Sequence, residues 1–454
     1  MKNLSETNRN NKKKWKTISF FVFIALGLTF STTMFGRQNE NKNDRFSTGR
    51  TKANSSQTEV KNSVDDNAYK FDGKISRRVL ENYLSRAITI ADLLRGQGNL
   101  QDNIRMISNI GAKFIGRSLC LWNAENNFLN DVERARKNAP QVLAAVPDVV
   151  LEACVFETVS PKINKIAIPA CIFTAFGLPV EKRNFRYDDI IYPLGQRRAM
   201  GPGAQVPDES RLETQLWFYY QAITYIDLGC EAIHFGQVEI MNKNDSDNTH
   251  WANLLSMVRA YGATHARRHI VLCDGHTPTG GLMHEGNPLL DFNEFPLRIK
   301  EVPDKPTEAI LKLGFSDGIY NKSKGGMTVN GWQCKYLPYL VEFDNYGASK
   351  HPGKPNTIEG EFDWIWGYDE ITWFAHQSNQ YRADWLHYAW DWVSKTDTNG
   401  HLEMPGGRML ASPLDKMKWY YANKPSSVVP DGSGDEETIR EIWSSDAAKP
   451  KLGN

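Results

Sequence analysis

Along most of the chain, segments whose apolar residues recur at helical intervals follow segments that form short, strand-like apolar runs. Residues 80–94 repeat apolar side chains at helical intervals, whereas residues 113–122 form a short apolar run that ends in the polar stretch 123–127. A spacing near 3.6 residues predicts a helix, and a short run rich in β-branched and aromatic side chains predicts a strand. Because the two patterns keep alternating, the sequence predicts an α/β protein.

The predicted strands are short, and longer helical segments separate several of them. Gly229 ends one of these helical segments, at a position where a helix C-terminus favours a left-handed residue. The expected helices are 80–94, 129–145, 210–229, 251–268 and 381–392, and the expected strands are 113–122, 149–157, 232–240, 270–275, 318–320, 339–344, 362–368 and 401–404.

This number and order of elements favours one fold class. Eight strands with intervening helices over roughly 330 residues suit a (β/α)8 TIM-like barrel. The Gly- and Pro-rich stretches 160–209 and 275–335 would then be long βα loops. A doubly wound open sheet is the alternative, but no Gly-x-Gly-x-x-Gly motif follows a predicted strand at the start of a helix.

The N-terminus has the pattern of an export signal. A basic segment, 1–17, precedes the apolar run 18–30, and small polar residues follow. Counted to residue 36, the apolar segment is long enough to cross a bilayer, so an uncleaved anchor with membrane association through residues 18–36 is the alternative to cleavage. We therefore expect export to the periplasm, the cell surface or the medium.

Composition narrows the class of protein and the layout of the chain. A net charge of +1 argues against a nucleic-acid partner, and six cysteines without a Cys-x-x-Cys spacing argue against a zinc ribbon. Aromatic residues make up 11% of the chain, too many for a disordered protein. The expected layout is a signal or anchor at 1–36, a polar linker at 37–75, a barrel at 76–415 and a partly irregular extension at 416–454.

Acidic side chains recur near the carboxyl ends of the predicted strands. In a barrel these ends meet at one face, where the active site forms. Asp369 precedes a helical segment and is expected to be its N-cap instead. The remaining strand-end acids are Glu157, Glu239, Asp274 and Asp344, and Trp122 ends the first predicted strand.

Two carboxylates that face one cavity suit the cleavage of a glycosidic bond. Burial and mutual repulsion separate the pKa values of such a pair, so that one group is protonated and the other ionised. Strand alternation places Glu239 on one face with Gln237, and we nominate Glu239 as the acid/base. Glu342 is the first choice for the nucleophile, Asp344 is its rival, and Asp274 is a third catalytic carboxylate.

Other side chains near the same strand ends predict contacts to a sugar, because aromatic faces stack on its C–H surfaces. The expected substrate contacts are Trp122, Gln237, Glu157, His276, Trp332, Trp366 and Trp373. Arg117 and Glu152 are charges in the middle of apolar strands, and they predict a buried ion pair.

The strand-end acids in Gln237-Val-Glu239 and Glu342-Phe-Asp344, together with the order of elements, resemble secreted TIM-barrel glycoside hydrolases over residues 76–412. The resemblance is to a broad class. It implies hydrolysis of O-glycosyl bonds in an oligo- or polysaccharide without a cofactor or a metal. In the large retaining group, the acid/base follows an Asn on the fourth strand and the nucleophile ends the seventh. Here Val238 precedes Glu239, and the predicted strands place the two acids on the third and sixth.

Two other functions stay open. A metal-dependent hydrolase or isomerase on the same barrel would use His234, Glu239, Asp274 and His276 as ligands, although no His-Glu-x-x-His motif occurs. A non-catalytic carbohydrate-binding surface protein would keep the aromatic side chains without needing paired acids.

Overall fold

A computed structural model describes residues 67–356, 363–414 and 417–445 of the chain. The predicted signal or anchor and most of the predicted polar linker lie outside these residues. Among the helices that are described, none combines the length and the apolar character needed to cross a membrane.

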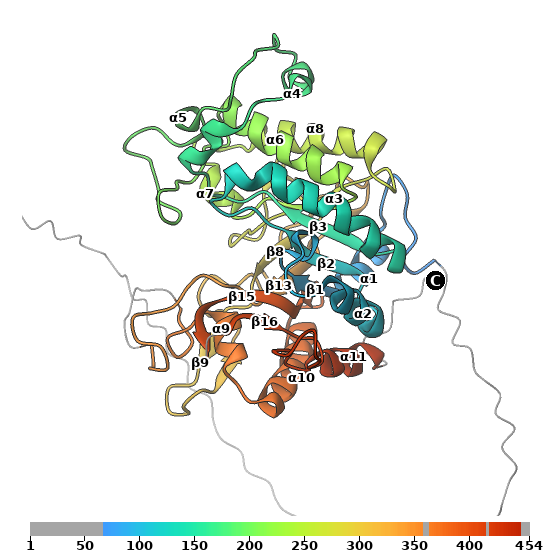
Figure 1. Cartoon of the computed structure of the whole chain (residues 1–454), viewed down its shortest axis with the longest axis vertical. Coiled ribbons are helices and arrows are strands. Elements are labelled where there is room, and N and C mark those ends of the chain that lie inside the picture. The colour runs from blue at the N-terminus through green and yellow to red at the C-terminus, as the bar shows by residue number, and fades with distance from the viewer. Residues whose placement is uncertain (1–66, 357–362, 415–416, 446–454) are drawn as a thin grey trace, which may run out of the picture. The chain divides into compact units, whose positions relative to one another are not determined.

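A mostly parallel sheet runs through the centre of the fold (Figure 1), and its five strands between residues 87 and 274 are short and fully buried. Strands that are covered on both faces have near-continuous apolar sequences, which is why they read as short apolar runs. The order is β16 (Met417–Tyr421), β15 (Met404–Leu414), β1 (Ala87–Ile90), β2 (Phe114–Leu119), β3 (Val150–Cys154), β4 (Ala232–His234) and β5 (Leu272–Asp274), and only the β15–β16 pair is antiparallel among these neighbours.

A second parallel sheet is formed by three further strands. It contains β8 (Asn293–Pro296), β13 (Tyr339–Glu342) and β14 (Gly400–Leu402), with β13 in the middle. A parallel bridge joins His276, just after β5, to Glu294 of β8. At the other edge, only Glu403 separates β14 from β15, and its N–H donates to the Val341 carbonyl over 2.9 Å. The chain is therefore a mixed α/β protein with parallel sheets.

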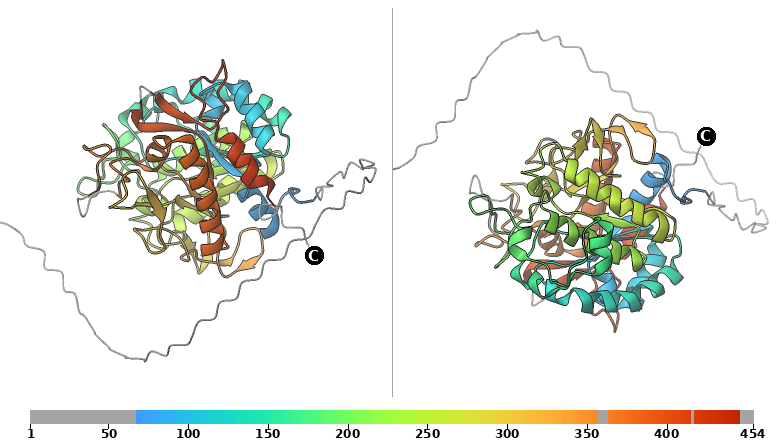
Figure 2. Two further views of the ribbon diagram at one scale, coloured as in Figure 1. Left: turned by 90° about the horizontal axis from the view of Figure 1, so that it is seen from below. Right: turned by 90° about the horizontal axis from the view of Figure 1, so that it is seen from above.

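Helices cover the strands on opposite sides. Figure 2 shows α10 and α11 towards one viewer and α6 and α8 towards the other. The long helices are α1 (Arg77–Leu84), α2 (Leu100–Ile110), α3 (Phe128–Ala145), α6 (Leu212–Asp227), α8 (Thr249–His265), α10 (Asn379–Thr396) and α11 (Glu436–Ser444), and the short ones are α4 (Ala170–Ala175), α5 (Tyr187–Ile190), α7 (Val238–Met241) and α9 (Glu370–Ala375).

The connections carry small antiparallel pairs and single helical turns rather than large elements. Short pairs of this kind decorate loops without adding a layer to the fold. The pairs are β6 (Met283–His284) with β7 (Asn287–Pro288), β9 (Ile299–Glu301) with β10 (Ala309–Leu311), and β11 (Gly326–Met327) with β12 (Gln333–Cys334), and the 3₁₀ turns are Leu93–Arg95, Glu125–Asn127 and Pro161–Lys165.

Several local predictions are confirmed. Gly229 follows α6 with a φ of +96°, as expected for a helix C-terminus. The Asp369 carboxylate accepts a hydrogen bond from the Thr372 N–H over 2.9 Å and so caps α9.

Other predictions about elements are wrong. The segment 80–94 contains the end of α1 and then the strand β1, because the β-branched run Ala87–Ile90 is buried on both faces. Residues 318–320 form no strand, and the described part of 362–368 holds isolated bridges only, from Tyr368 to Ile365 and to Ala348. The stretch 275–335 contains β8, so it is more than a loop.

These corrections change the position that each strand takes when the parallel strands are counted along the chain. With β1 added at the start, β4 is the fourth parallel strand, and with β8 in place of 318–320, β13 is the seventh. Glu239 therefore follows the fourth strand and Glu342 ends the seventh.

Two apolar clusters divide the core. The larger lies among the strands and the surrounding helices. The smaller gathers the first residues of several strands, such as Ala87, Phe114 and Ala232, under side chains of α1 such as Leu80. Helix α1 thus covers the amino ends of the strands, and the opposite ends are where polar side chains converge.

Candidate active site

Arg117 leaves the regular path of its strand. Its φ is +55°, a left-handed conformation that costs a non-glycine residue about 1–2 kcal/mol, and the register of β2 against β3 shifts between Ile115 and Leu119. The bulge aims the guanidinium across the sheet at Glu342 of β13. Arg117 Nε lies 2.7 Å from Glu342 Oε2, and Arg117 Nη2 also contacts Glu342 Oε1. Strain of this kind gathers at functional sites.

Arg408 of β15 holds Glu342 from the other side. Its Nη1 lies 3.0 Å from Glu342 Oε2, and its Nη2 donates to Asp344 Oδ1 over 2.9 Å. Glu342 has no exposed surface, whereas 19% of the Asp344 side chain is exposed. Burial alone would raise the pKa of Glu342, but the charges of Arg117 and Arg408 outweigh it and lower that pKa to about 2. Glu342 is therefore an enclosed, ionised carboxylate.

Two histidines and two carboxylates lie next to Glu342 and its two arginines. We call these residues, together with Glu152 and Glu403, the buried cluster. His234 and Asp274 are paired in register on β4 and β5, and His234 Nδ1 lies 2.6 Å from Asp274 Oδ2. The same nitrogen lies 2.8 Å from Glu294 Oε2 of β8. His276 Nε2 is 3.2 Å from both Glu342 Oε1 and Arg117 Nη2, so His276 links this group to the arginine pair.

Protonation differs sharply between the acids of the cluster. Burial, followed by repulsion from neighbouring carboxylates such as Glu294, raises the pKa of Glu152, Asp274 and Glu403 well above the ordinary values. Burial acts in the same direction on Glu294, but His234 and Arg117 reverse it and lower that pKa. Neutral and ionised carboxyl groups thus lie side by side, which is the arrangement that acid–base chemistry uses.

Glu239 does not lie on a strand as predicted. Strand β4 ends at His234, because Gly236 turns the chain with a φ of +59°, and Glu239 lies in the first turn of α7. Its Oε1 accepts hydrogen bonds from the Thr279 hydroxyl over 2.6 Å and from the Thr279 N–H over 3.2 Å. The carboxylate is half-buried and lies beyond the same strand ends as Asp344.

Gln237 and Glu157, both predicted to bind substrate, contact one another. Gln237 Nε2 donates to Glu157 Oε1 over 2.7 Å, and the Gln237 N–H donates to Glu157 Oε2 over 3.1 Å. Gly236 leaves room for this carboxylate, since a Cβ there would overlap it. Glu157 is buried, so it fixes the loop after β4.

The predicted Arg117–Glu152 ion pair is wrong in its geometry. Glu152 Oε2 accepts a hydrogen bond from the backbone N–H of Arg117 over 3.0 Å, while the guanidinium lies on Glu342. The left-handed turn at Arg117 directs its backbone and its side chain to different strands. Both residues are nevertheless buried, as the mid-strand charges predicted.

The predicted aromatic contacts fall into two groups. Trp122 is 44% exposed and packs edge-on against Phe156, with ring centroids 5.3 Å apart. Trp366 and Trp373 are buried, with each indole N–H bound to a backbone carbonyl. Trp332 donates to the Ile75 carbonyl and packs against the cluster at the amino ends of the strands. Of the four predicted aromatic contacts, only Trp122 therefore stays a candidate for substrate binding, and the other three tryptophans pack within the fold.

Phe156 connects Trp122 to the buried cluster. The Arg117 guanidinium carbon lies 5.5 Å from the centre of the Phe156 ring, and the His234 ring lies 6.1 Å from it. A cation at this distance from an aromatic face is attracted to it. The rings of Phe156 and Trp122 therefore form a continuous line of contacts from the buried cluster to the surface.

Three members of the cluster were missed in the sequence. Glu294 lies in the four-residue strand Asn293–Pro296, which is too short and too polar at its start to stand out from a Gly- and Pro-rich stretch. Glu403 was visible as an acid in the predicted strand 401–404. Arg408 follows Gly406 and Gly407, with no apolar run to mark it as buried.

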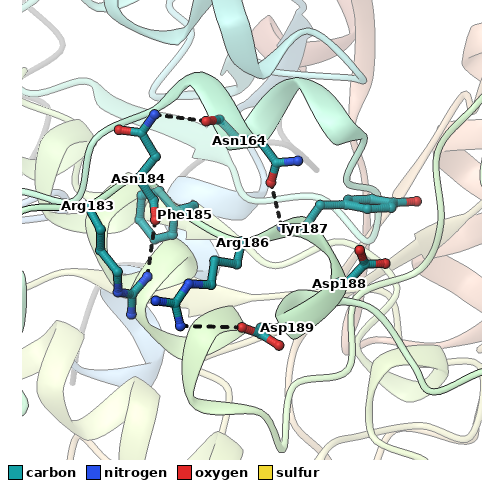
Figure 3. Close-up of a pocket in the computed structure, with 8 residues that line it drawn as sticks. All are labelled: Asn164, Arg183, Asn184, Phe185, Arg186, Tyr187, Asp188 and Asp189. Atoms are coloured by element: carbon teal, nitrogen blue, oxygen red, sulfur yellow. Dashed lines mark hydrogen bonds and ion pairs between the residues drawn. The ribbon is translucent and has the colours of Figure 1, made fainter.

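Two surface pockets lie away from this cluster. One, of about 500 Å³, is lined by Asn164 and residues 183–189 in the connection between β3 and α6 (Figure 3). The other, of about 580 Å³, includes Asp148 and Arg268, which precede β3 and β5 and so lie at the amino ends of the strands. Residues of the cluster line neither pocket, so the chemistry of the side chains, and not the size of a pocket, identifies the candidate site.

Comparisons with known proteins give only distant structural likenesses. No protein-family model matches the chain, and no curated protein matches its sequence. The structures similar to it include a debranching enzyme of Nostoc punctiforme, with 10% identity and a TM-score of 0.29 over 50% of this chain and 53% of the enzyme.

Two further similar structures also come from glycoside hydrolases. One is the α-galactosidase AgaA of Geobacillus stearothermophilus, with 13% identity and a TM-score of 0.25 over 43% of this chain and 28% of that one. The other is the glycoside hydrolase domain of a Pseudomonas aeruginosa PelA variant, with 7% identity and a TM-score of 0.27 over 52% and 78%. The chain thus spans about half the length of the debranching enzyme. At these TM-scores the likenesses carry no argument about activity, which must come from the site itself.

Proposed function

We propose that the chain is an exported glycan-processing glycoside hydrolase that acts on an oligo- or polysaccharide with a pair of carboxylates. The observation that carries this proposal is the position of Asp344. Its carboxylate is partly exposed just after the seventh parallel strand, and it is held by Arg408 over 2.9 Å. Glu239 follows the fourth strand at the same ends of the series.

Asp344 and Glu239 would divide the two roles that glycosidic cleavage requires. One carboxylate attacks the anomeric carbon or activates water, and the other protonates the leaving oxygen. The guanidinium of Arg408 fits Asp344 for the nucleophilic role, because it donates a charge-assisted hydrogen bond that orients the carboxylate. Glu239, held by Thr279 and half-buried, is then the acid/base.

Glu342 acts in this proposal as a positioning residue. Both of its oxygens contact arginines, and it has no exposed surface with which to reach a substrate. Its charge fixes Arg408, and Arg408 in turn fixes Asp344. A carboxylate held in this way loses little orientational freedom on reaching the transition state.

Trp122 supports a sugar as the substrate. An exposed tryptophan beside a polar site offers an apolar face for the C–H surface of a pyranose ring. Phe156 packs edge-on against Trp122 and also contacts the Arg117 guanidinium of the cluster.

We also propose that the parallel strands close into a (β/α)8 barrel. The pairing of β1 with β15, the contact of Glu403 with Val341 and the bridge between His276 and Glu294 support closure. In such a barrel the carboxyl ends of the strands form one rim, where active sites lie.

A substrate screen tests the proposal. The full chain is incubated with aryl glycosides and with polysaccharides, with and without EDTA, and released sugar or phenol is measured. We expect turnover of at least one glycoside in the presence of EDTA. Saturable binding of oligosaccharides with no turnover across the screen would instead identify a carbohydrate-binding protein and overturn the proposal.

A further inference from the structure

The buried cluster holds more negative groups than its cations balance. Its acids are Glu152, Asp274, Glu294, Glu342 and Glu403, all at most 1% exposed, and its arginines are Arg117 and Arg408. Glu342 engages both arginines. The remaining acids must carry protons or share another cation, because an unpaired buried charge is very costly.

Four of these side chains crowd around one point between neighbouring strands. Glu152, His234, Asp274 and Glu294 come from β3, β4, β5 and β8, and one ligand atom from each lies within 4.8 Å of the others. Ligand atoms at 2.0–2.2 Å from a zinc ion are at most about 4.4 Å apart. The separation of the four atoms is thus close to that of one coordination sphere.

Hydrogen bonding within the chain leaves these side chains incompletely satisfied. Among the described residues, Glu152 Oε1, Asp274 Oδ1 and Glu294 Oε2 are buried without a hydrogen-bond partner, as is His234 Nε2 on the other side of the imidazole ring from Nδ1. Such atoms are rare in folded proteins and usually indicate a bound water or ion. Each of the three carboxylates in this group thus carries one such oxygen.

The contacts of His234 also favour a bound cation. Its Nδ1 lies 2.6 Å from Asp274 Oδ2 and 2.8 Å from Glu294 Oε2. A ring nitrogen has at most one proton, so it can donate one good hydrogen bond and not two. A cation bound by all three atoms would satisfy them together, since ligand atoms of one ion lie at comparable distances.

We propose that Glu152, His234, Asp274 and Glu294 bind one divalent transition-metal ion of the Zn²⁺ or Mn²⁺ class. One imidazole nitrogen with three carboxylates is a mixed donor set that suits these ions better than Ca²⁺ or Mg²⁺, which prefer oxygen ligands alone. The site lies beside the arginine pair and joins four strands, and it does not depend on the proposed glycosidase activity.

His276 is outside this ligand set. Its Nε2 faces the Arg117 guanidinium at 3.2 Å, and a cation at that nitrogen would be repelled. Glu239, which the sequence suggested as a metal ligand, is bound to Thr279 instead.

The experiment uses the full-length chain and readouts other than glycosidase activity. Metal content is measured by mass spectrometry after purification, and the chelator-treated protein is titrated with MnCl2 and ZnCl2 by calorimetry and thermal melting. CoCl2 adds a visible absorption band when it enters a mixed N/O site. The test variants are Asp274→Asn and Glu152→Gln, and Glu209→Gln is the matched control, because Glu209 is a fully buried acid outside the cluster.

We expect saturation at about one ion per chain and a rise in melting temperature of about 3 °C at a hundredfold excess over Kd. Each test variant should bind at least about tenfold more weakly, since even groups behind the ligands change affinity by that factor. Glu209→Gln should bind as the wild type does. Absence of saturable binding in the wild type, or unchanged affinity in a folded Asp274→Asn or Glu152→Gln variant, would overturn the proposal.

Discussion

Arg408 donates a hydrogen bond from Nη2 to Oδ1 of Asp344 over 2.9 Å, and its Nη1 lies 3.0 Å from the enclosed Glu342. The buried Glu342 therefore orients the Arg408 guanidinium, and the guanidinium in turn orients the partly exposed Asp344. Arg117 also contacts Glu342, and the charges of the two arginines together keep this buried carboxylate ionised.

Replacing Arg408 with Met should lower kcat by about 10- to 100-fold and change KM little, because Asp344 loses its orientation while substrate contacts stay. Steady-state kinetics on a glycoside found in the substrate screen measures this split. Arg408→Lys should recover part of kcat, since a cation returns without the two-pronged geometry. An unchanged kcat in a folded Arg408→Met variant would remove Arg408 from the account.

Glu342→Gln should destabilise the fold by about 3–5 kcal/mol, because it removes the fully buried carboxylate charge that contacts both Arg117 and Arg408. Urea unfolding followed by fluorescence measures the change. Asp344→Asn is the comparison, and it should cost about 1 kcal/mol or less, since its carboxylate is partly exposed. Equal losses for the two variants would contradict the buried position of Glu342.

Glu209 should make the fold less stable as the pH rises. Burial, followed by repulsion from Asp245 and Asp208, raises its pKa to about 10, far above the ordinary value of an unfolded chain. A raised pKa means that the native state holds a proton that the unfolded state has lost. The contribution to stability is therefore complete below about pH 4.5 and is lost as the pH increases towards 10.

Glu209→Gln tests this dependence, because the amide keeps the shape of the protonated acid and cannot ionise. The variant should flatten the decline of unfolding free energy between about pH 5 and 9, as measured by urea unfolding at several pH values. A slope identical to that of the wild type would show that Glu209 is ionised in the native state.

Gly116→Ala should disturb the cluster from the backbone side. A Cβ at Gly116 would overlap the Glu403 carboxylate, and overpacking of this kind costs about 1–3 kcal/mol. Gly407→Ala on β15 is the matched control, since its Cβ would lie 3.5 Å from Ile90 in ordinary contact. Thermal unfolding of both variants measures the difference, and similar melting temperatures would contradict the close approach of Glu403.

The sequence predicted the α/β class and several buried acids, because strand-end carboxylates and short apolar runs are local signals. Arg117 was recognised as buried, but its partner was not, since a bulge in β2 redirects the side chain. Glu239 was placed on a strand because apolar alternation continues past His234, while Gly236 in fact turns the chain into α7.

The parts that escaped prediction depend on contacts between distant segments. Strand β1 contains only four residues, and its apolar spacing merges with that of α1. Glu294 becomes part of the site only because β8 pairs with β13, a pairing that no local pattern in Asn293–Pro296 reveals. Arg408 is buried by the same kind of long-range pairing.

The most direct test of the account compares hydrolysis by the wild type with that by Asp344→Asn and Glu239→Gln on one cleavable glycoside, with sugar binding measured by calorimetry in parallel. The account predicts that each variant loses at least about 100-fold in kcat while it still folds and binds the sugar. Near-wild-type turnover in a folded Asp344→Asn variant would contradict the central claim, because the exposed carboxylate after β13 would then take no part in the cleavage.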